Sequence, residues 1–78
     1  MIPDLEVDAI GLLCPLPVLR LRKRSVGLPK GSVVRLLADD PAALIDVPHF
    51  CAEAGHEFLG ENAVEGAETV RSYLVRLG

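Results

Sequence analysis

Among the side chains of this sequence that could do covalent chemistry, Cys14 has the most informative setting. It lies in the stretch GLLCPLPVLRLRKR, where Pro15 follows it directly and Pro17 follows two residues later. Proline favours the first position of a helix, where its missing N–H has no partner to lose. We therefore expect Pro15 and Pro17 to support a helix start that places Cys14 at or beside the N-cap. The positive end of a helix stabilises a thiolate, so this position predicts a lowered thiol pKa.

Pro17 stands where a Cys-x-x-Cys redox motif would have its second cysteine. Cys14 therefore has no neighbour with which to close a disulfide across this turn, but it can carry a group such as a persulfide or a mixed disulfide. The alternative is an inert cysteine in a buried apolar turn, since cysteine is often fully buried. Cys51 lies on the apolar stripe of a predicted helix, and we interpret it as a core residue.

Hydrophobic periodicity predicts the elements around Cys14. Residues 4–9 alternate polar and apolar side chains, as in a strand buried on one face only. Helical spacing continues from Pro15 to about Val26, and Gly27 ends it. Residues 33–38 form a nearly continuous apolar run, which indicates a central strand.

A second helix is predicted after Asp39, with Asp40 as N-cap and Pro41 at the first helical position. Pro48 then either kinks this helix or lies in the first turn of a second segment capped by Asp46. Residues 56–61 resemble a short strand, residues 62–68 a polar connection, and residues 70–77 a last strand.

The resulting order, βαβαββ, predicts an α+β two-layer sandwich in one domain spanning residues 1–78. Its four-stranded mixed sheet should carry both helices on one face, because the acidic residues of the first strand keep the other face in water. Right-handed crossovers make the first three strands run in the same direction. Cys14 and the pair Asp39 and Asp40 should then share one rim, where the carboxylates would raise the thiol pKa.

Charge and composition exclude several functional classes. Residues 1–38 hold six basic and three acidic side chains, whereas residues 39–78 hold two basic and eight acidic ones. Overall acidity and three aromatic residues disfavour nucleic acid as the main ligand. No apolar run approaches the roughly 20 residues that a membrane span needs. The first ten residues carry acidic side chains, where a signal peptide would carry basic ones followed by an apolar stretch. We therefore expect a cytoplasmic location, no membrane partner, no metal site and no cofactor.

Three basic residues, Arg20, Lys23 and Arg24, share one face of the first predicted helix. This face could dock an acidic partner or a tRNA backbone, although an ordinary solvated helix face is the more common explanation of such a pattern. His49 is expected on the surface, and His56 is interpreted as a contact at the start of a strand rather than as a general base.

These motifs together resemble those of the TusA/SirA/YedF family of small sulfur carriers. The likeness rests on the Cys-Pro-x-Pro motif with its preceding Asp8-Ala9-x-Gly11-Leu12, on Ala38-Asp39-Asp40-Pro41-Ala42, and on later blocks around Asp46 and Gly55. The resemblance implies the same βαβαββ sandwich. It also implies that Cys14 receives sulfane sulfur as a persulfide from a cysteine desulfurase or rhodanese and passes it to an acceptor protein.

Known branches of the family serve tRNA 2-thiouridine synthesis, sulfur oxidation or cofactor synthesis. Where TusA itself has Arg-Cys-Pro-Glu-Pro, this chain has Leu13 and Leu16 around the motif, which indicates a more apolar docking surface. Two further functions remain open at this point. One is a redox-responsive thiol regulator, and the other is a non-catalytic RNA- or protein-binding module that uses the basic helix face.

Overall fold

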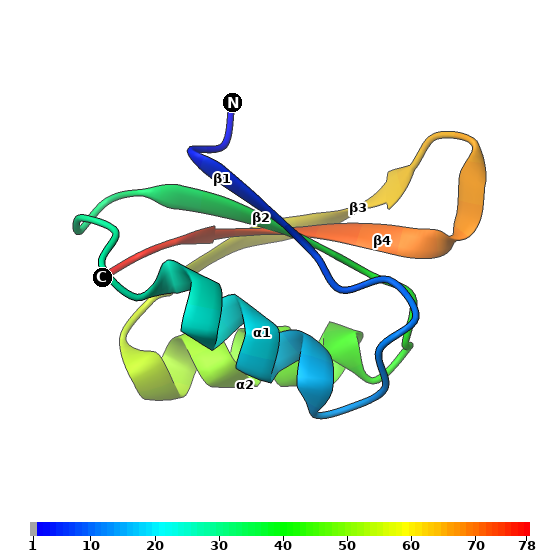
Figure 1. Ribbon diagram of the computed structural model, residues 1–78, viewed down its shortest axis with the longest axis horizontal. Helices are drawn as coiled ribbons and strands as arrows, with labels where there is room; N and C mark the ends of the chain where they lie inside the picture. Colours follow the sequence, from blue (N-terminus) through cyan, green and yellow to red (C-terminus); the bar gives the residue numbers. More distant parts are fainter. Residues whose placement is uncertain (1) are drawn as a thin grey trace.

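The computed structural model describes residues 2–78, and its elements follow the predicted order (Figure 1). In chain order the elements are β1 (Leu5–Asp8), α1 (Leu16–Ser25), β2 (Val33–Ala38), α2 (Ala43–Ala54), β3 (Glu57–Val64) and β4 (Ala67–Arg76). Neither helix in this part of the chain has the length and apolar character that a membrane span requires.

The four strands form one mixed sheet in the order β1-β2-β4-β3. β1 runs parallel to β2, while β4 lies antiparallel to both β2 and β3. The first three strands therefore point in the same direction, as the crossover argument predicts. β2 occupies a central position, in agreement with its apolar sequence.

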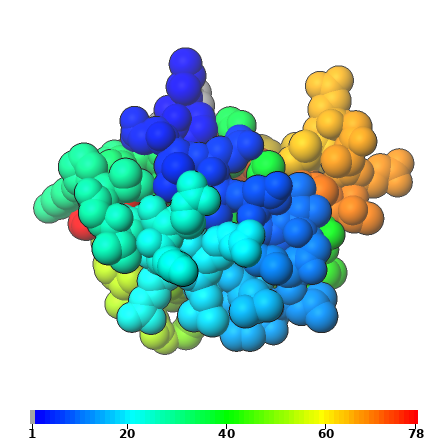
Figure 2. Space-filling model, viewed as in Figure 1, coloured from blue at the N-terminus to red at the C-terminus, as the bar shows by residue number. Residues whose placement is uncertain are grey.

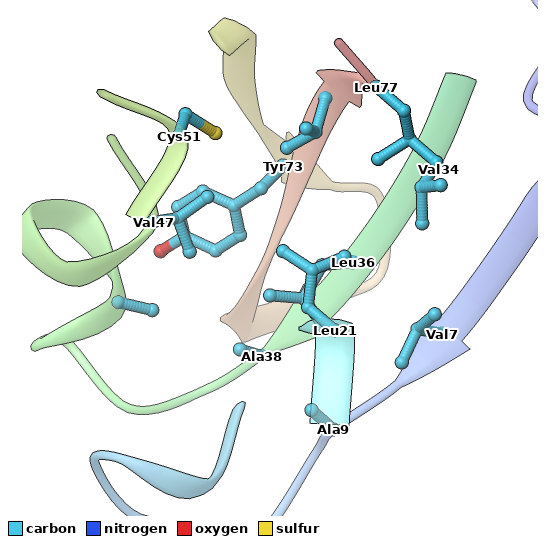
Figure 3. Packing of buried hydrophobic residues seen from close by; sticks show 12 residues of the cluster. Val7, Ala9, Leu21, Val34, Leu36, Ala38, Val47, Cys51, Tyr73 and Leu77 are labelled. Atoms are coloured by element: carbon cyan, nitrogen blue, oxygen red, sulfur yellow. The ribbon is translucent and has the colours of Figure 1, made fainter. Parts of the chain in front are cut away.

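Both helices cover the same face of the sheet, so the two-layer sandwich is confirmed (Figure 1). The core lies between the layers, where Leu36 of β2 pairs with Val7 on one side and with Tyr73 on the other. Leu21 of α1 and Val47 of α2 complete this cluster from the helical layer (Figure 3). In β1, by contrast, Glu6 and Asp8 are exposed on the open face, as their alternation predicts.

The start and the middle of α2 differ from the prediction. Asp40 caps a short turn rather than the helix itself, because its Oδ1 accepts the main-chain N–H of Ala42, and the helix begins at Ala43. Pro48 lies inside a single continuous helix, so Asp46 does not cap a second segment and belongs to the first turn of α2. Gly55 ends the helix with a φ of 77°, a conformation that glycine adopts without steric cost.

The predicted polar connection between the last two strands was wrong. β3 and β4 extend through most of residues 62–68 and are joined by Glu65 and Gly66 alone. Gly66 has a φ of 78°, which a tight hairpin turn needs. The hairpin projects beyond the helices (Figures 1 and 2), so its polar residues Asn62 and Glu68 face solvent from strands rather than from a loop.

Candidate functional site

Cys14 lies in the loop that joins β1 to α1, at the rim where both helices begin. Two carboxylates from the loop after β2 hold this segment. Asp39 Oδ1 accepts the main-chain N–H of Gly11 at 2.9 Å, and Asp40 Oδ2 accepts that of Cys14 at 2.6 Å. The predicted shared rim of Cys14, Asp39 and Asp40 is therefore present. Because the loop is fixed through its backbone, the side chain of Cys14 stays free to face solvent.

The start of α1 is shifted by one residue from the prediction. Pro15 is the N-cap and Leu16 is the first helical residue, which places Cys14 immediately before the cap. Pro17 occupies the second helical position and is buried, so it packs the first turn against the body of the protein. The two prolines frame the helix start as expected, but Pro15 does so from outside the helix.

The thiol of Cys14 is exposed and donates a hydrogen bond of 2.8 Å to Oδ2 of Asp46. This contact raises the pKa of Cys14, because the carboxylate accepts the thiol proton. Desolvation, the negative charge of Asp46 and that of Asp40 act in the same direction. The prediction of a lowered pKa was therefore wrong. The helix start is adjacent to Cys14, but the closest charged group is a carboxylate of the other helix.

Sequence reasoning missed Asp46 as a member of this site. Its position near Pro48 was explained as a helix cap, and that explanation left the side chain without a further role. One signal could have found it. Both helices begin at the same rim, so an acidic residue in the first turn of α2 must lie near the residue that precedes α1.

A shallow cleft of about 240 Å³ opens beside the thiol between the two helices. The side chains that line it are those of Cys14, Pro15, Val18, Asp46, His49, Phe50 and Glu53. His49 Nε2 pairs with Glu53 Oε1 at 2.6 Å, one helical turn apart on the exposed side of α2. The cleft therefore combines an apolar floor with acidic side chains, and its lining contains no lysine or arginine.

The predicted docking residues fall into two groups. A groove of about 450 Å³ along α1 is lined by Leu12, Leu16, Leu19, Arg20, Lys23 and Arg24. The structure thus brings the basic face together with Leu16. Leu13 does not line this groove, although it is the more exposed of the two leucines at 71 %. Arg20 also donates to the main-chain oxygen of Asp8 at 3.0 Å, which ties α1 to the end of β1.

Of the remaining candidate residues, His49 lines the cleft beside the thiol, whereas Cys51 and His56 do not. Cys51 is 1 % exposed within the core, as expected, and burial raises its pKa to about 11. His49 is a surface residue, in agreement with the prediction. His56 precedes β3, contacts the ring of Phe50, and accepts the main-chain N–H of Gly78 through Nδ1. Its interpretation as a strand-start contact fits this geometry.

Residues 2–78 contain no cluster of histidine, cysteine and carboxylate side chains arranged to hold a metal ion. What this arrangement offers chemically is one accessible thiol on a rigid rim, with a proton acceptor in contact with it. The only other cysteine is enclosed by the core.

Comparisons with known proteins agree with this geometry. A family model described as Sulfurtransferase TusA matches residues 5–76. The Sulfur carrier protein TusA of Pseudomonas syringae pv. syringae (strain B728a) is 44% identical over 63 residues, covering 81% of this chain and 75% of the relative. The protein of the same name from Pseudomonas entomophila (strain L48) is 42% identical over 66 residues, covering 85% and 82%.

Among solved structures, the SirA-like protein of Desulfitobacterium hafniense matches with a TM-score of 0.72 and 25% identity. The match covers 95% of this chain and 97% of that one, so the two share the complete arrangement of helices and sheet. On the strength of the family model and of these relatives, the chain belongs to the TusA family.

Proposed function

We propose that this protein is a sulfur carrier, which accepts sulfane sulfur as a persulfide on Cys14 and relays it to an acceptor protein. The observation that carries the proposal is the exposure of the Cys14 thiol at the rim, in a chain whose relatives are named sulfur carrier proteins. Cys51 cannot share this role, because the core encloses it.

The loading step needs only the thiol and a donor persulfide. Cys14 Sγ attacks the terminal sulfur of the donor, a new S–S bond forms on Cys14, and the S–S bond within the donor breaks. The donor leaves as a thiolate and takes up the proton that Cys14 releases, so no oxidant or reductant is consumed. Unloading is the same exchange with an acceptor thiol as the attacking group.

In this proposal the protein contributes presentation of the sulfur. Asp39 and Asp40 fix the backbone before and at Cys14, and Pro17 packs the first turn of α1. A sulfur held in one place reacts faster with a docked partner, because less entropy is lost in bringing the two reacting sulfur atoms together. We class this activity as that of a sulfurtransferase working as a carrier.

The partners proposed are a sulfur donor of the cysteine desulfurase or rhodanese type and a downstream acceptor protein. Exposed apolar and basic side chains before and along α1 offer a docking surface for them, namely Leu13, Leu16, Arg20, Lys23 and Arg24. No observation favours the redox-regulator alternative, since Cys14 has no accessible second thiol within the described chain. The basic groove alone does not favour an RNA-binding module over a protein partner.

The test is transfer of radioactive sulfur from labelled cysteine by a cysteine desulfurase. Label should appear on the wild type and on Cys51→Ala, and it should be absent from Cys14→Ser. Circular dichroism of each variant establishes that the fold is retained. Absence of label from the folded wild-type protein, with a desulfurase that loads a known carrier in the same assay, would remove the proposal.

A further inference from the structure

The charged groups that face Cys14 are almost all acidic. Asp46 of α2 accepts the thiol proton, and Asp40 of the loop after β2 accepts the main-chain N–H. Elsewhere in the cleft, Glu53 of α2 pairs with His49 and does not touch the thiol, while the uncharged Pro15 and Val18 line the side of α1. The local field therefore favours a proton on sulfur over a thiolate.

Asp46 is the group best placed to control that proton. Its Oδ2 lies 2.8 Å from Cys14 Sγ, and it belongs to the first turn of a helix anchored in the core through Val47 and Cys51. A carboxylate held at this distance on a rigid element accepts the thiol hydrogen bond continuously. It also has no other hydrogen-bond donor among the contacts of the described residues, so the thiol is its partner in the free protein.

We propose that Asp46 holds the proton on Cys14 Sγ in the free carrier, and that a cationic side chain of the sulfur donor releases it by pairing with Asp46. This inference rests on the proposed function, because it concerns the loading of the same thiol. It makes Asp46 a positioning residue that restrains the nucleophile until the right partner docks. The chemistry required of the partner is a lysine or arginine beside its persulfide.

The restraint and its release leave the transfer balanced. In the free protein the S–H bond is intact and points at the carboxylate. When a donor cation pairs with Asp46, the carboxylate no longer opposes negative charge on sulfur, and Cys14 attacks the donor's terminal sulfur as a thiolate. The proton passes to the departing donor thiolate, directly or through water. In the absence of a donor, Cys14 stays protonated and therefore reacts slowly with small oxidants and alkylating agents.

The first test measures the rate at which iodoacetamide alkylates Cys14 between pH 6 and pH 11, with mass spectrometry assigning the modified residue. Asp46→Asn should lower the apparent pKa of Cys14 and raise the alkylation rate at pH 7. The gain is about three- to fourfold per pKa unit, since the larger thiolate fraction is partly offset by weaker nucleophilicity. Asp46→Ala should shift the pKa the same way without adding an N–H donor. The matched control, Glu53→Gln, changes a charge in the same cleft that does not touch sulfur and should leave the profile unchanged.

The second test compares two synthetic peptides that carry a cysteine persulfide and differ only in one neighbouring residue, lysine or the uncharged norleucine. The wild type should load faster from the lysine peptide. The ratio of the two loading rates, lysine peptide over norleucine peptide, should be unchanged in Glu53→Gln and should fall toward one in Asp46→Asn. This is the coupling expected when the lysine pairs directly with Asp46.

The outcomes separate this inference from the proposed function. An unchanged or higher Cys14 pKa in both Asp46 variants overturns the proton restraint, and an undiminished lysine preference in Asp46→Asn overturns its release by a donor cation. Neither measurement needs a desulfurase. Sulfur carriage fails by a different observation, namely that folded wild-type protein takes no sulfur on Cys14 from any persulfide.

Discussion

The main-chain N–H of Cys14 donates a 2.6 Å hydrogen bond to Asp40, a residue 26 positions further along the chain. The second carboxylate oxygen of Asp40 accepts the N–H of Ala42 at 3.0 Å. One side chain therefore ties the loop before α1 to the turn before α2. These two hydrogen bonds hold the pKa of Asp40 below its ordinary value, because both favour the charged form.

Replacement of this carboxylate should loosen the rim. Asp40→Ala removes both acceptors, so we expect slower sulfur loading at Cys14 and a lower urea midpoint than in the wild type. Asp40→Asn keeps one acceptor oxygen, so its loading rate and urea midpoint should lie between those of Asp40→Ala and the wild type. Urea denaturation and labelled-sulfur transfer measure the two effects. An Asp40→Ala protein with wild-type loading and an unchanged midpoint would contradict the role given to this residue.

Acid should reproduce the same loss in the wild type. Asp40 has an ordinary pKa of 3.8 and a lower one in the folded state, so its contribution to stability is complete above about pH 4. The contribution disappears as the pH falls through the folded value and the unfolded chain binds the extra proton. Denaturation midpoints between pH 5 and pH 2 should therefore fall more steeply in the wild type than in Asp40→Asn. Equal slopes would show that the hydrogen bonds do not favour the charged form.

Alkali should act through the buried cysteine. The ordinary pKa of 9.0 applies to Cys51 in the unfolded chain, whereas burial raises the folded value to about 11. Between these values the unfolded state binds fewer protons than the folded one, so the free energy of unfolding decreases as the pH rises. Urea denaturation from pH 8 to pH 11 should show this decrease.

Cys51→Ala is the matched control for the alkaline effect. It should show a shallower decrease over the same range. A remainder should come from Cys14, whose pKa the hydrogen bond to Asp46 raises, and from Tyr73, whose pKa burial raises. If the variant and the wild type lose stability in parallel, ionisation of Cys51 is not the cause.

Two leucines of α1 offer a comparison of identical chemistry in different surroundings. Leu21 is fully buried beneath the helix, whereas Leu19 is 47 % exposed. Leu21→Ala should lower the free energy of unfolding by about 2–5 kcal/mol through lost burial and the cavity left behind. Leu19→Ala should change it by about 0.5 kcal/mol or less. Equal losses in the two variants, measured by urea denaturation, would mean that α1 does not depend on Leu21 as its core anchor.

The leucines that flank the motif should affect partners rather than stability. Leu13 and Leu16 are 71 % and 49 % exposed, so substitution by serine removes little buried surface. Leu13→Ser and Leu16→Ser should keep the wild-type urea midpoint and the wild-type loading rate from a small persulfide. Loading from a protein donor should slow, and Leu44→Ser, at a comparably exposed leucine of α2, serves as control. Slower loading from both kinds of donor would place the defect in the thiol instead of the docking surface.

Local patterns in the sequence correctly predicted the order of elements along the chain, the central position of β2, the face covered by helices and the shared rim. Strict alternation in β1 and a continuous apolar run in β2 are properties of single segments, and each segment's burial follows from them. The long β3–β4 hairpin was missed because its tip mixes polar residues with small apolar ones and contains no apolar run. Residues 62–68 carry the composition of a loop, and only pairing between the strands makes them extended.

The thiol environment was harder to predict for a related reason. Pro15 indicates a helix start next to Cys14, which is local information, and that part was right to within one residue. The contact from Asp46 depends on how α2 lies beside α1, because the two partners are 32 positions apart in the sequence. The spacing of residues in the sequence does not show how two helices pack, so the direction of the pKa shift of Cys14 could not be predicted from the motif.

The Cys14 loop begins at the end of β1, which is a four-residue edge strand paired only with β2. The centre of the sheet is held far more extensively, because residues 71–76 of β4 pair with β2 on one side and with β3 on the other. Stability is therefore uneven across the fold, and amide protons of β1 should exchange through local opening while those of β2 and β4 wait for global unfolding. Local opening of β1 would therefore leave the rest of the sheet paired, while Asp39 and Asp40 still hold the Cys14 loop through its backbone.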